Sequence, residues 1–340
     1  MATPLVSVLM SAYNAAATLE ATLQSLQAQT LDDFEVVAVD DGSADATRKI
    51  LETWQKNFPP LRLIAAEHRG LIPALNQGLG LCRGRFVARM DADDLAHPQR
   101  LEKQVLLLEQ QPDISVVGSL VETFPREDVR EGLRIYEEWL NQLVSHEDIS
   151  REIFIESPIA NPSAMVRRRE ILELGSYCDH GWPEDYDLWL RYFVAGRRFA
   201  KVPEVLLSWR EHPQRVTHTD SRYSVENFLR AKAFYLIQGP LRENRDLIVW
   251  GAGKTGRRLS KHLIRGGHTP QAFVDIAAAK IGKSLRGVPI IGVSELPALW
   301  RQLECPVLLA AVASRGARAL IRAELARLQL VEARDFWCVA

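Results

Sequence analysis

Short apolar runs that end at polar turns, and that alternate with segments of helical spacing, constrain the fold of this chain most. Four of these runs lie before Asp91, and after each of them apolar residues recur at helical spacing. Strands that alternate with helices are typical of an α/β protein with a mainly parallel sheet covered on both faces. The expected strands are Leu5–Met10, Phe34–Val39, Leu61–Ala65 and Arg85–Met90.

The same alternation begins a second time near residue 246. The apolar run Asp246–Trp250 is followed by Gly251-Ala252-Gly253-Lys254-Thr255-Gly256 and a basic amphipathic segment. A glycine-rich turn between a strand and a helix predicts a Rossmann-like fold for this part. We therefore expect a first domain over residues 1–220, a connecting helix or linker over 221–243, and a smaller Rossmann-like α/β domain over 244–340.

The composition excludes several classes of protein. The 340 residues carry 42 Lys and Arg against 43 Asp and Glu, which gives a net charge of −1, and 47% of them are hydrophobic. These proportions are ordinary for a globular protein, and the balanced charge gives no sign of nucleic acid as a partner. The four widely spaced cysteines and the lack of a long apolar run predict a reduced, cytoplasmic chain, with only peripheral contact at the inner face of a membrane.

Acidic residues gather directly after the fourth expected strand, in the segment Asp91-Ala92-Asp93-Asp94. In open α/β sheets, ligands bind at the carboxyl ends of the strands, and these carboxylates lie at such an end. Carboxylate oxygens on a tight turn are suitable ligands for Mg²⁺ or Mn²⁺. The alternative is an acidic turn that caps the following helix and binds no ion.

Four segments, in order and with matching spacing, resemble the family 2 glycosyltransferases of the GT-A fold. The resemblance covers roughly the first 215 residues. It implies that the first domain has the GT-A sheet and that the chain is a glycosyltransferase. The four segments are Val6–Asn14, Gln29–Thr30, Glu35–Asp45 and Ala88–Asp94.

By this resemblance, the acidic segment is the D-x-D element of the family. Asp93 would bind Mn²⁺ or Mg²⁺ directly, with Asp91 beside it, and the ion would bridge the diphosphate of a nucleotide-sugar donor. The segment Trp209-Arg210-Glu211-His212 resembles a loop that closes over the donor in many relatives. His212 is therefore a further candidate ligand of the metal or of a phosphate, and a solvated loop histidine is the alternative.

The resemblance also implies where the nucleotide binds. Ala12, Tyr13 and Asn14 would line the base and the ribose, and Asp40 would accept a hydrogen bond from uracil. Asp41 is a further candidate for contact with the nucleotide. The alternative for the two aspartates is a plain turn, because Asp and Gly are common turn residues.

A second pair of carboxylates begins a helix, in the segment Pro183-Glu184-Asp185. Acidic side chains in the first turn stabilise a helix through its dipole, and that role alone would account for the pair. The resemblance implies a further role, since a Glu-Asp pair at this place supplies the catalytic base of the family. Asp185 would take the proton of an acceptor hydroxyl, and Glu184 would contact the substrate.

The glycine-rich turn of the second domain predicts a ligand of its own. Gly251, Gly253 and Gly256 would let a diphosphate approach the start of the helix, and Asp275 would bond a ribose hydroxyl. The ligand would be a dinucleotide or a nucleotide-sugar with a regulatory or docking role. The alternative is that this domain binds nothing.

Together, these residues predict an inverting glycosyltransferase that moves a sugar from a UDP-sugar to a hydroxyl of a cell-surface glycan or lipid-linked precursor. Inversion is expected because a single displacement needs one base, and no second carboxylate pair of the retaining kind is present. Two alternatives remain open. One is an NAD(P)-dependent sugar oxidoreductase that uses the second domain, and the other is a non-catalytic nucleotide-sugar sensor.

Overall fold

The computed structural model describes residues 3–340. Contacts divide the chain into two compact units, and each has its own sheet. The first unit consists of Met1–Ile149, Pro158–His180 and Ala195–Thr219, and the second of Ser150–Ser157, Gly181–Val194 and Asp220–Ala340. The second unit therefore includes helix α8 (Glu184–Val194), which carries the expected catalytic base.

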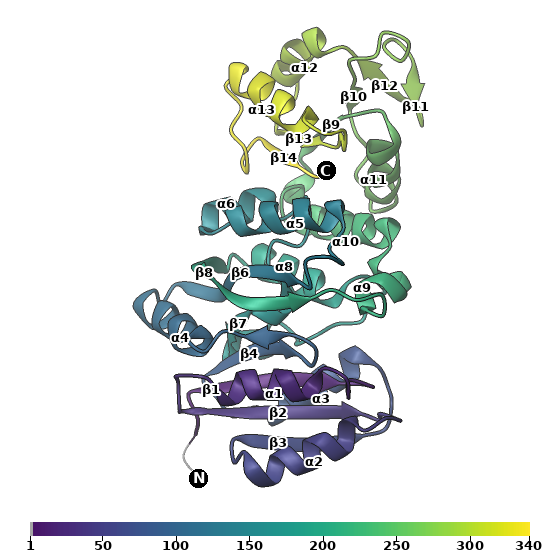
Figure 1. The fold of residues 1–340 in the computed structure, drawn as a ribbon. Helices are drawn as coiled ribbons and strands as arrows, with labels where there is room; N and C mark the ends of the chain where they lie inside the picture. The colour runs from purple at the N-terminus through teal and green to yellow at the C-terminus, as the bar shows by residue number, and fades with distance from the viewer. Residues whose placement is uncertain (1–2) are drawn as a thin grey trace. The chain divides into compact units, whose positions relative to one another are not determined.

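The first unit is built on an eight-stranded sheet with the strand order β3-β2-β1-β4-β7-β6-β8-β5 (Figure 1). Its first four strands, from β3 to β4, are parallel. The strands are β1 (Val6–Ala12), β2 (Phe34–Asp41), β3 (Leu61–Ala66), β4 (Phe86–Asp91), β5 (Leu95–Ala96), β6 (Ile114–Phe124), β7 (Met165–Arg167) and β8 (Arg198–Arg210).

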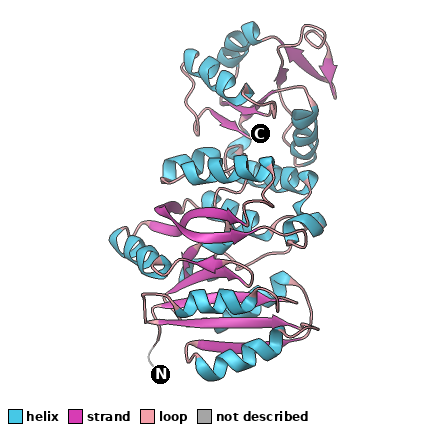
Figure 2. Ribbon diagram, in the orientation of Figure 1, coloured by secondary structure: helices cyan, strands magenta, loops and turns pink. Residues whose placement is uncertain are grey.

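Helices cover this sheet (Figure 2), and α3 packs on β1 and β2 while α2 packs on β3. Because both faces are covered, β1 is apolar along most of its length, and Val6, Val8 and Met10 have no exposed surface. The helices are α1 (Leu19–Gln27), α2 (Thr47–Asn57), α3 (Leu71–Leu81), α4 (Arg100–Gln110), α5 (Glu131–Gln142), α6 (His146–Glu152, which continues into the second unit), the 3₁₀ helix η1 (Asn161–Ser163), α7 (Arg168–Glu173) and α9 (Val216–Thr219).

The expected α/β architecture is confirmed, with one difference in the first sheet. The four strands expected before Asp91 all form, and they make its parallel part. The short strand β7 lies between β4 and β6 and is antiparallel to both, so the sheet as a whole is mixed. Three residues are too few for a recognisable apolar pattern, which is why the sequence did not indicate this strand.

The second unit is built on a six-stranded sheet with the order β11-β12-β10-β9-β13-β14. Its strands pair in parallel except in the hairpin of β11 and β12. This confirms the expected smaller α/β unit after the GT-A sheet. The strands are β9 (Asp246–Trp250), β10 (Ala272–Val274), β11 (Ser284–Leu285), β12 (Val288–Ile291), β13 (Pro306–Ala310) and β14 (Phe336–Cys338).

Within the second unit, helix α10 packs against both α8 and α11. The sequence predicts this helix as the connection between two domains. The domain boundaries expected from the sequence, at residues 220 and 244, stay a prediction. The helices of this unit are α8, η2 (Ser221–Tyr223), α10 (Val225–Gln238), η3 (Arg242–Asn244), α11 (Lys254–Arg265), η4 (Val293–Glu295), α12 (Leu296–Gln302) and α13 (Ala317–Arg327).

Across residues 3–340, none of the helices combines the length and the apolar character that crossing a membrane requires.

Candidate active site

Three neighbouring parallel strands end at the same edge of the first sheet. In the register of the sheet, Ala12 of β1 pairs with Asp40 of β2, and Ser11 pairs with Asp91 of β4. The carboxyl ends of these strands therefore bring together the expected nucleotide and metal residues. This edge is where ligands bind in open α/β sheets.

Hydrogen bonds join the turns that follow β1 and β2. The Asn14 N–H donates to Ser43 Oγ at 3.0 Å, and the Ala44 N–H donates to Asn14 Oδ1 at 2.9 Å. Asp40 is buried, and its Oδ1 accepts the Ser43 N–H at 3.1 Å. Asn14 and Asp40 therefore fix the shape of the two turns, and the second carboxylate oxygen of Asp40 has no protein partner among residues 3–340.

Asp41 fixes a third turn, the segment 68–70 after β3. Its carboxylate accepts the N–H groups of Arg69 and Gly70, both at 2.9 Å, and lies 2.8 Å from His68 Nδ1. The His68 ring stacks on Tyr13 with centroids 4.0 Å apart and an angle of 16° between the planes. Tyr13 is 48% exposed, so this stack presents an aromatic surface beside the strand ends.

A cavity of about 490 Å³ opens next to the same turn. Its wall comes from the end of β2, the segment after β3 and the start of α3. The lining residues are Asp41, Ala66, Glu67, Arg69, Pro73, Ala74 and Gln77.

The acidic segment after β4 concentrates three carboxylates. One oxygen from each of Asp91, Asp93 and Asp94 lies within 4.8 Å of the other two. Asp91 forms an ion pair with Arg89, and Asp93 Oδ2 lies 2.8 Å from His212 Nε2. The segment is held in place by α1, since Thr22 Oγ1 donates to the Asp94 carbonyl at 2.9 Å.

Asp94 is the most buried of the three acidic side chains. It is 1% exposed, and its Oδ1 accepts the Arg210 N–H at 2.7 Å. Its Oδ2 is buried without a hydrogen-bond partner among residues 3–340. Burial, with the charges of Asp93 and Asp91, raises the pKa of Asp94 well above its ordinary value. Burial and the charge of Asp91 also raise the pKa of Asp93. Such crowding of negative charge is relieved by protons or by a bound cation.

In the second unit, the first turn of α8 carries Glu184 and Asp185. Glu184 is buried, and both of its oxygens accept the Tyr223 hydroxyl at 3.0–3.1 Å. Asp185 is half-buried, and its Oδ1 accepts the Tyr186 N–H at 2.7 Å. Burial, followed by the charge of Glu184, raises the pKa of Asp185 to about 8. A carboxylate with a raised pKa is a stronger base than an ordinary one.

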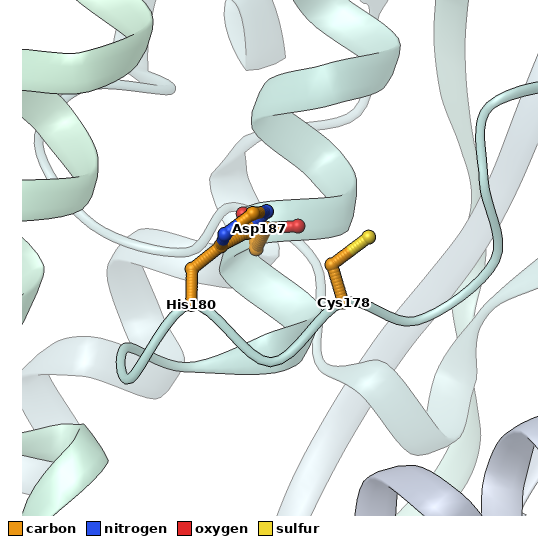
Figure 3. Close-up of side chains that lie close together, drawn as sticks. All are labelled: Cys178, His180 and Asp187. Atoms are coloured by element: carbon orange, nitrogen blue, oxygen red, sulfur yellow. The ribbon is translucent and has the colours of Figure 1, made fainter.

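A third acidic residue on α8, Asp187, is part of the core of the second unit. Its Oδ1 accepts from Trp182 Nε1 and from the Tyr235 hydroxyl, both at 2.7 Å, and its Oδ2 lies 2.8 Å from Arg191 Nε. Figure 3 shows Asp187 on the helix and Cys178 on the preceding loop. Because both of its oxygens are bonded to its own unit, Asp187 has a structural role.

A glycosyltransferase family model, described as "Glycosyl transferase family 2", matches residues 7–175. The amylovoran biosynthesis glycosyltransferase AmsE of Erwinia amylovora is 36% identical over 208 residues, which are 60% of this chain and 75% of the relative. The chain belongs to glycosyltransferase family 2. This membership favours a transferase over the sugar oxidoreductase that the glycine-rich turn left open.

Two further comparisons bear on this family 2 glycosyltransferase. The UDP-Gal:alpha-D-GlcNAc-diphosphoundecaprenol beta-1,3-galactosyltransferase of Escherichia coli is 27% identical over 211 residues, 61% of this chain and 74% of the relative. The structure of S. aureus TarS 1-349 in complex with UDP-GlcNAc aligns with a TM-score of 0.58 at 18% identity, and covers 78% of this chain and 73% of that one. The likeness to TarS supports the fold.

The structure places the predicted residues of the family 2 glycosyltransferase in three groups, and their roles stay predictions. The first unit brings the nucleotide and metal candidates to one edge of its sheet, including His212, which is 119 residues from Asp93 in the chain. The second unit holds Glu184 and Asp185 on α8, and Gly251, Gly253, Gly256 and Asp275 around the start of α11.

Sequence reasoning assigned no role to Asp94 or to His68. Asp94 lies in the acidic segment itself, so the presence of a third carboxylate at the strand end could have indicated it from the sequence. The sequence does not show that one of its oxygens is buried without a hydrogen-bond partner among the described residues. His68 stacks on Tyr13 across 55 positions of the chain, and no local pattern indicates that contact.

Proposed function

We propose that this family 2 glycosyltransferase is an inverting, metal-assisted enzyme that transfers a sugar from a UDP-sugar to a hydroxyl of a cell-surface glycan or lipid-linked precursor. The observation that carries the proposal is the cluster of Asp91, Asp93 and Asp94 at the end of β4. Its carboxylate oxygens lie within 4.8 Å of one another, and one buried oxygen of Asp94 has no hydrogen-bond partner among residues 3–340.

The donor atoms of this cluster fit a hard divalent cation. All three side chains offer carboxylate oxygens, which suit Mg²⁺ and Mn²⁺. Asp93 and Asp91 would hold the ion, and Asp94 would add a third carboxylate to the cluster. His212 contacts Asp93 and would orient it. When bound, the cation would neutralise the charge that develops on the departing diphosphate.

The nucleotide would bind on the other side of β1 from the acidic cluster. Asp40 keeps one carboxylate oxygen available for a donor group of the base, since only Ser43 bonds the other. Tyr13 offers an exposed ring for stacking, while Ala12 and Asn14 shape the turn beside it. A UDP-sugar is supported by the E. coli relative, whose name contains UDP-Gal, and by TarS, which was solved with UDP-GlcNAc.

Asp185 would be the catalytic base. An acceptor hydroxyl must lose its proton as it attacks the anomeric carbon, and a positioned carboxylate contributes about 10²–10⁴-fold to such a step. The pKa of Asp185, raised to about 8 first by burial and then by Glu184, makes its carboxylate a suitable proton acceptor. Attack from the face opposite the nucleotide inverts the anomeric centre in one displacement.

The acceptor would be a growing glycan or its lipid-linked precursor. AmsE is named for the biosynthesis of amylovoran, and the E. coli relative is named for a diphosphoundecaprenol acceptor. An acceptor of that second kind is held in a membrane, so the enzyme would reach it by peripheral contact at the cytoplasmic face.

Thermal unfolding with UDP, with and without Mn²⁺, tests the donor site. A ligand at about 100 times its dissociation constant stabilises the native state by roughly 2.7 kcal/mol, which is readily measured. We expect UDP to stabilise the wild type more strongly with Mn²⁺, and Asp93→Ala to lose that increment. The matched control is Asp32→Ala, which removes an exposed carboxylate from the loop before β2, at the opposite end of the strands.

Two outcomes would each contradict one part of the proposed donor site, the metal or the uracil. If Asp93→Ala keeps the full metal-dependent shift, the metal assignment is wrong. If UDP stabilises the protein under neither condition while another nucleoside diphosphate does, the choice of uracil is wrong and the strand-end site remains.

A further inference from the structure

A second cavity, of about 570 Å³, lies in the second unit at the glycine-rich turn after β9. Its walls come from the start of α11, the start of α10 and the segment before β12. The lining contains one carboxylate, Glu226, against six basic side chains. These are Lys254, Arg257, Arg258, Lys261, Lys280 and Arg286.

Three of the six cations have carboxylate partners. Lys261 and Arg258 lie 3.2 and 3.6 Å from the carboxylate of Glu226, and Lys280 lies 2.8 Å from Asp275 Oδ2. Two of the three share Glu226, so three positive charges face two carboxylates and one positive charge stays unbalanced.

The other three cations, Lys254, Arg257 and Arg286, form no ion pair among residues 3–340. Arg286 is held in place by neutral acceptors, since its Nη1 donates to the Arg257 carbonyl at 2.7 Å and lies 3.0 Å from Ser260 Oγ. The hairpin that carries Arg286 is thereby tied to α11. With the charge left over at Glu226, about four positive charges around the cavity are uncompensated, and they attract a ligand with several negative charges.

The glycine-rich turn leaves open space beside the backbone of Gly253. A Cβ atom on Gly256 would lie 1.8 Å from the Gly251 carbonyl oxygen, so the turn packs tightly against the start of the helix. A Cβ on Gly253 would meet nothing within 4 Å. The backbone at Gly253, directly before the first turn of α11, is therefore accessible to a ligand, and the unpaired N–H groups of that turn favour an anion.

Asp275 supports this turn. Its Oδ2 accepts the Ala252 N–H at 3.0 Å and Lys280 Nζ at 2.8 Å, and its Oδ1 accepts the Ala277 N–H at 2.9 Å. These three donors use most of the hydrogen bonds that the carboxylate can accept, so few are left for the two hydroxyls of a ribose. Recognition in this cavity therefore depends on phosphate more than on ribose.

We propose that this cavity binds a nucleoside diphosphate through its free diphosphate group. The terminal phosphate carries about −1.5 to −2 charges at pH 7 and the inner one about −1, so a free diphosphate balances more of the positive charge of this cavity than an esterified one. In a dinucleotide or a nucleotide-sugar, both phosphates are esterified, and the group carries only about −2. None of these residues belongs to the proposed donor site. The link to catalysis rests on the proposed function, because transfer from a nucleotide-sugar releases a nucleoside diphosphate.

Calorimetric titration of the full chain in EDTA, with ADP, UDP and NAD⁺ as probes, tests the proposal. EDTA removes metal-dependent binding at the donor site, and ADP avoids the uracil pocket. Gly253→Val fills the opening, and its backbone, with φ of −86°, accepts a side chain without strain. Lys254→Gln/Arg257→Gln removes two of the charges. Arg265→Gln is the control, since it removes an exposed charge at the other end of the same helix.

We expect ADP to bind the wild type at least about 10-fold more tightly than NAD⁺, because the esterified diphosphate lacks one charge. Gly253→Val should abolish ADP binding, the double variant should weaken it about 10-fold or more, and Arg265→Gln should leave it unchanged. The proposal is overturned if ADP does not bind, if NAD⁺ binds as tightly, or if Gly253→Val and the double variant bind ADP like the wild type. A failure of the metal-dependent UDP shift with Asp93→Ala would leave this result standing, so the two proposals are separable.

Discussion

His212 Nε2 lies 2.8 Å from Asp93 Oδ2, and this contact joins the segment after β8 to the acidic cluster after β4. The two residues are 119 positions apart in the chain. Both segments belong to the first unit. A ligand side chain and its hydrogen-bonded partner usually act together in binding a metal.

We expect His212→Ala to weaken Mn²⁺-dependent UDP binding about 10-fold, which is the usual cost of removing the partner of a ligand. The measurement is a titration of UDP at fixed Mn²⁺. His218→Ala is the matched control, because His218 lies in the same region but contacts Glu211 at 2.7 Å. An equal loss in both variants would indicate that the segment matters for closure and that His212 has no special contact with the metal site.

Asp185→Asn should lower the transfer rate about 10²–10⁴-fold, because the amide cannot accept the proton of the acceptor hydroxyl. UDP affinity should stay close to that of the wild type. In the wild type, the rate should rise as the pH rises through about 8, since burial and the charge of Glu184 raise the pKa of Asp185 to that value and only the carboxylate acts as a base. Loss of transfer and of UDP binding together would indicate a structural role.

The same pKa predicts how stability depends on pH. A carboxyl group whose pKa is higher in the folded state than in the unfolded state favours folding while it is protonated, and this advantage is lost as the pH rises through the folded value. The free energy of unfolding of the wild type, relative to Asp185→Asn, should therefore fall between about pH 4 and pH 8. Urea unfolding of both proteins at pH 5, 7 and 9 measures this difference, and a constant difference would contradict the raised pKa.

Asp94→Asn should stabilise the protein in EDTA by about 1 kcal/mol at a pH high enough to ionise Asp94, because it removes one of three crowded carboxylates. The Arg210 N–H, which donates to Asp94 Oδ1 at 2.7 Å, keeps an oxygen acceptor in the variant. The extra stabilisation by Mn²⁺ should decrease at the same time. Thermal unfolding with EDTA and with Mn²⁺ measures both effects. Destabilisation in EDTA would show that the charge of Asp94 is compensated within the protein.

Tyr13→Ala should weaken UDP binding about 10-fold, because stacking of a base on an aromatic ring contributes about 1–3 kcal/mol. Tyr13→Phe keeps the ring that stacks on His68 and should bind UDP like the wild type. A titration of UDP with each variant distinguishes ring stacking from a contact of the hydroxyl. Equal loss in both variants would assign the effect to the hydroxyl.

Asp187→Ala should cost about 3 kcal/mol of unfolding free energy or more, because it leaves Arg191, Trp182 and Tyr235 without their shared acceptor. Denaturant unfolding followed by tryptophan fluorescence measures the loss. Asp185→Asn, on the same helix, is the control and should keep the fold at pH 7. A stable Asp187→Ala protein would show that the buried network is dispensable.

The sequence predicted the part of the fold in which each strand is a continuous apolar run. The strands β1, β2 and β4 come closest to that condition and are almost wholly buried, while the edge strand β3 is partly exposed and is interrupted by Arg62. The strand β8 does not, since its pairing with β6 contains register irregularities and part of it is exposed. The three-residue strand β7 is specified by its neighbours β4 and β6 and has no pattern of its own.

For the candidate site, the sequence predicted which acidic residues lie at the ends of strands and helices better than it predicted which side chains contact one another. The acidic segment after β4 and the Glu-Asp pair of α8 are visible as residue types at the ends of expected elements. The contacts of His212 with Asp93 and of His68 with Tyr13 join segments that are far apart in the chain. No periodicity or spacing indicates either contact; the family resemblance placed His212 at the metal site, and nothing in the sequence indicated the stack of His68 on Tyr13.

The parallel register of the first sheet also fixes the distance between two of the proposed donor-binding residues. Asp40 is the second-last residue of β2 and Asp91 is the last residue of β4, with β1 between them, so two strand spacings separate these residues across the sheet. Neighbouring strands lie about 4.8 Å apart, which places the two strand ends about 10 Å from each other. Changes in the turns can alter which base or sugar is preferred, but they cannot change this span. A donor that contacts both side chains, as proposed, must therefore bridge about 10 Å.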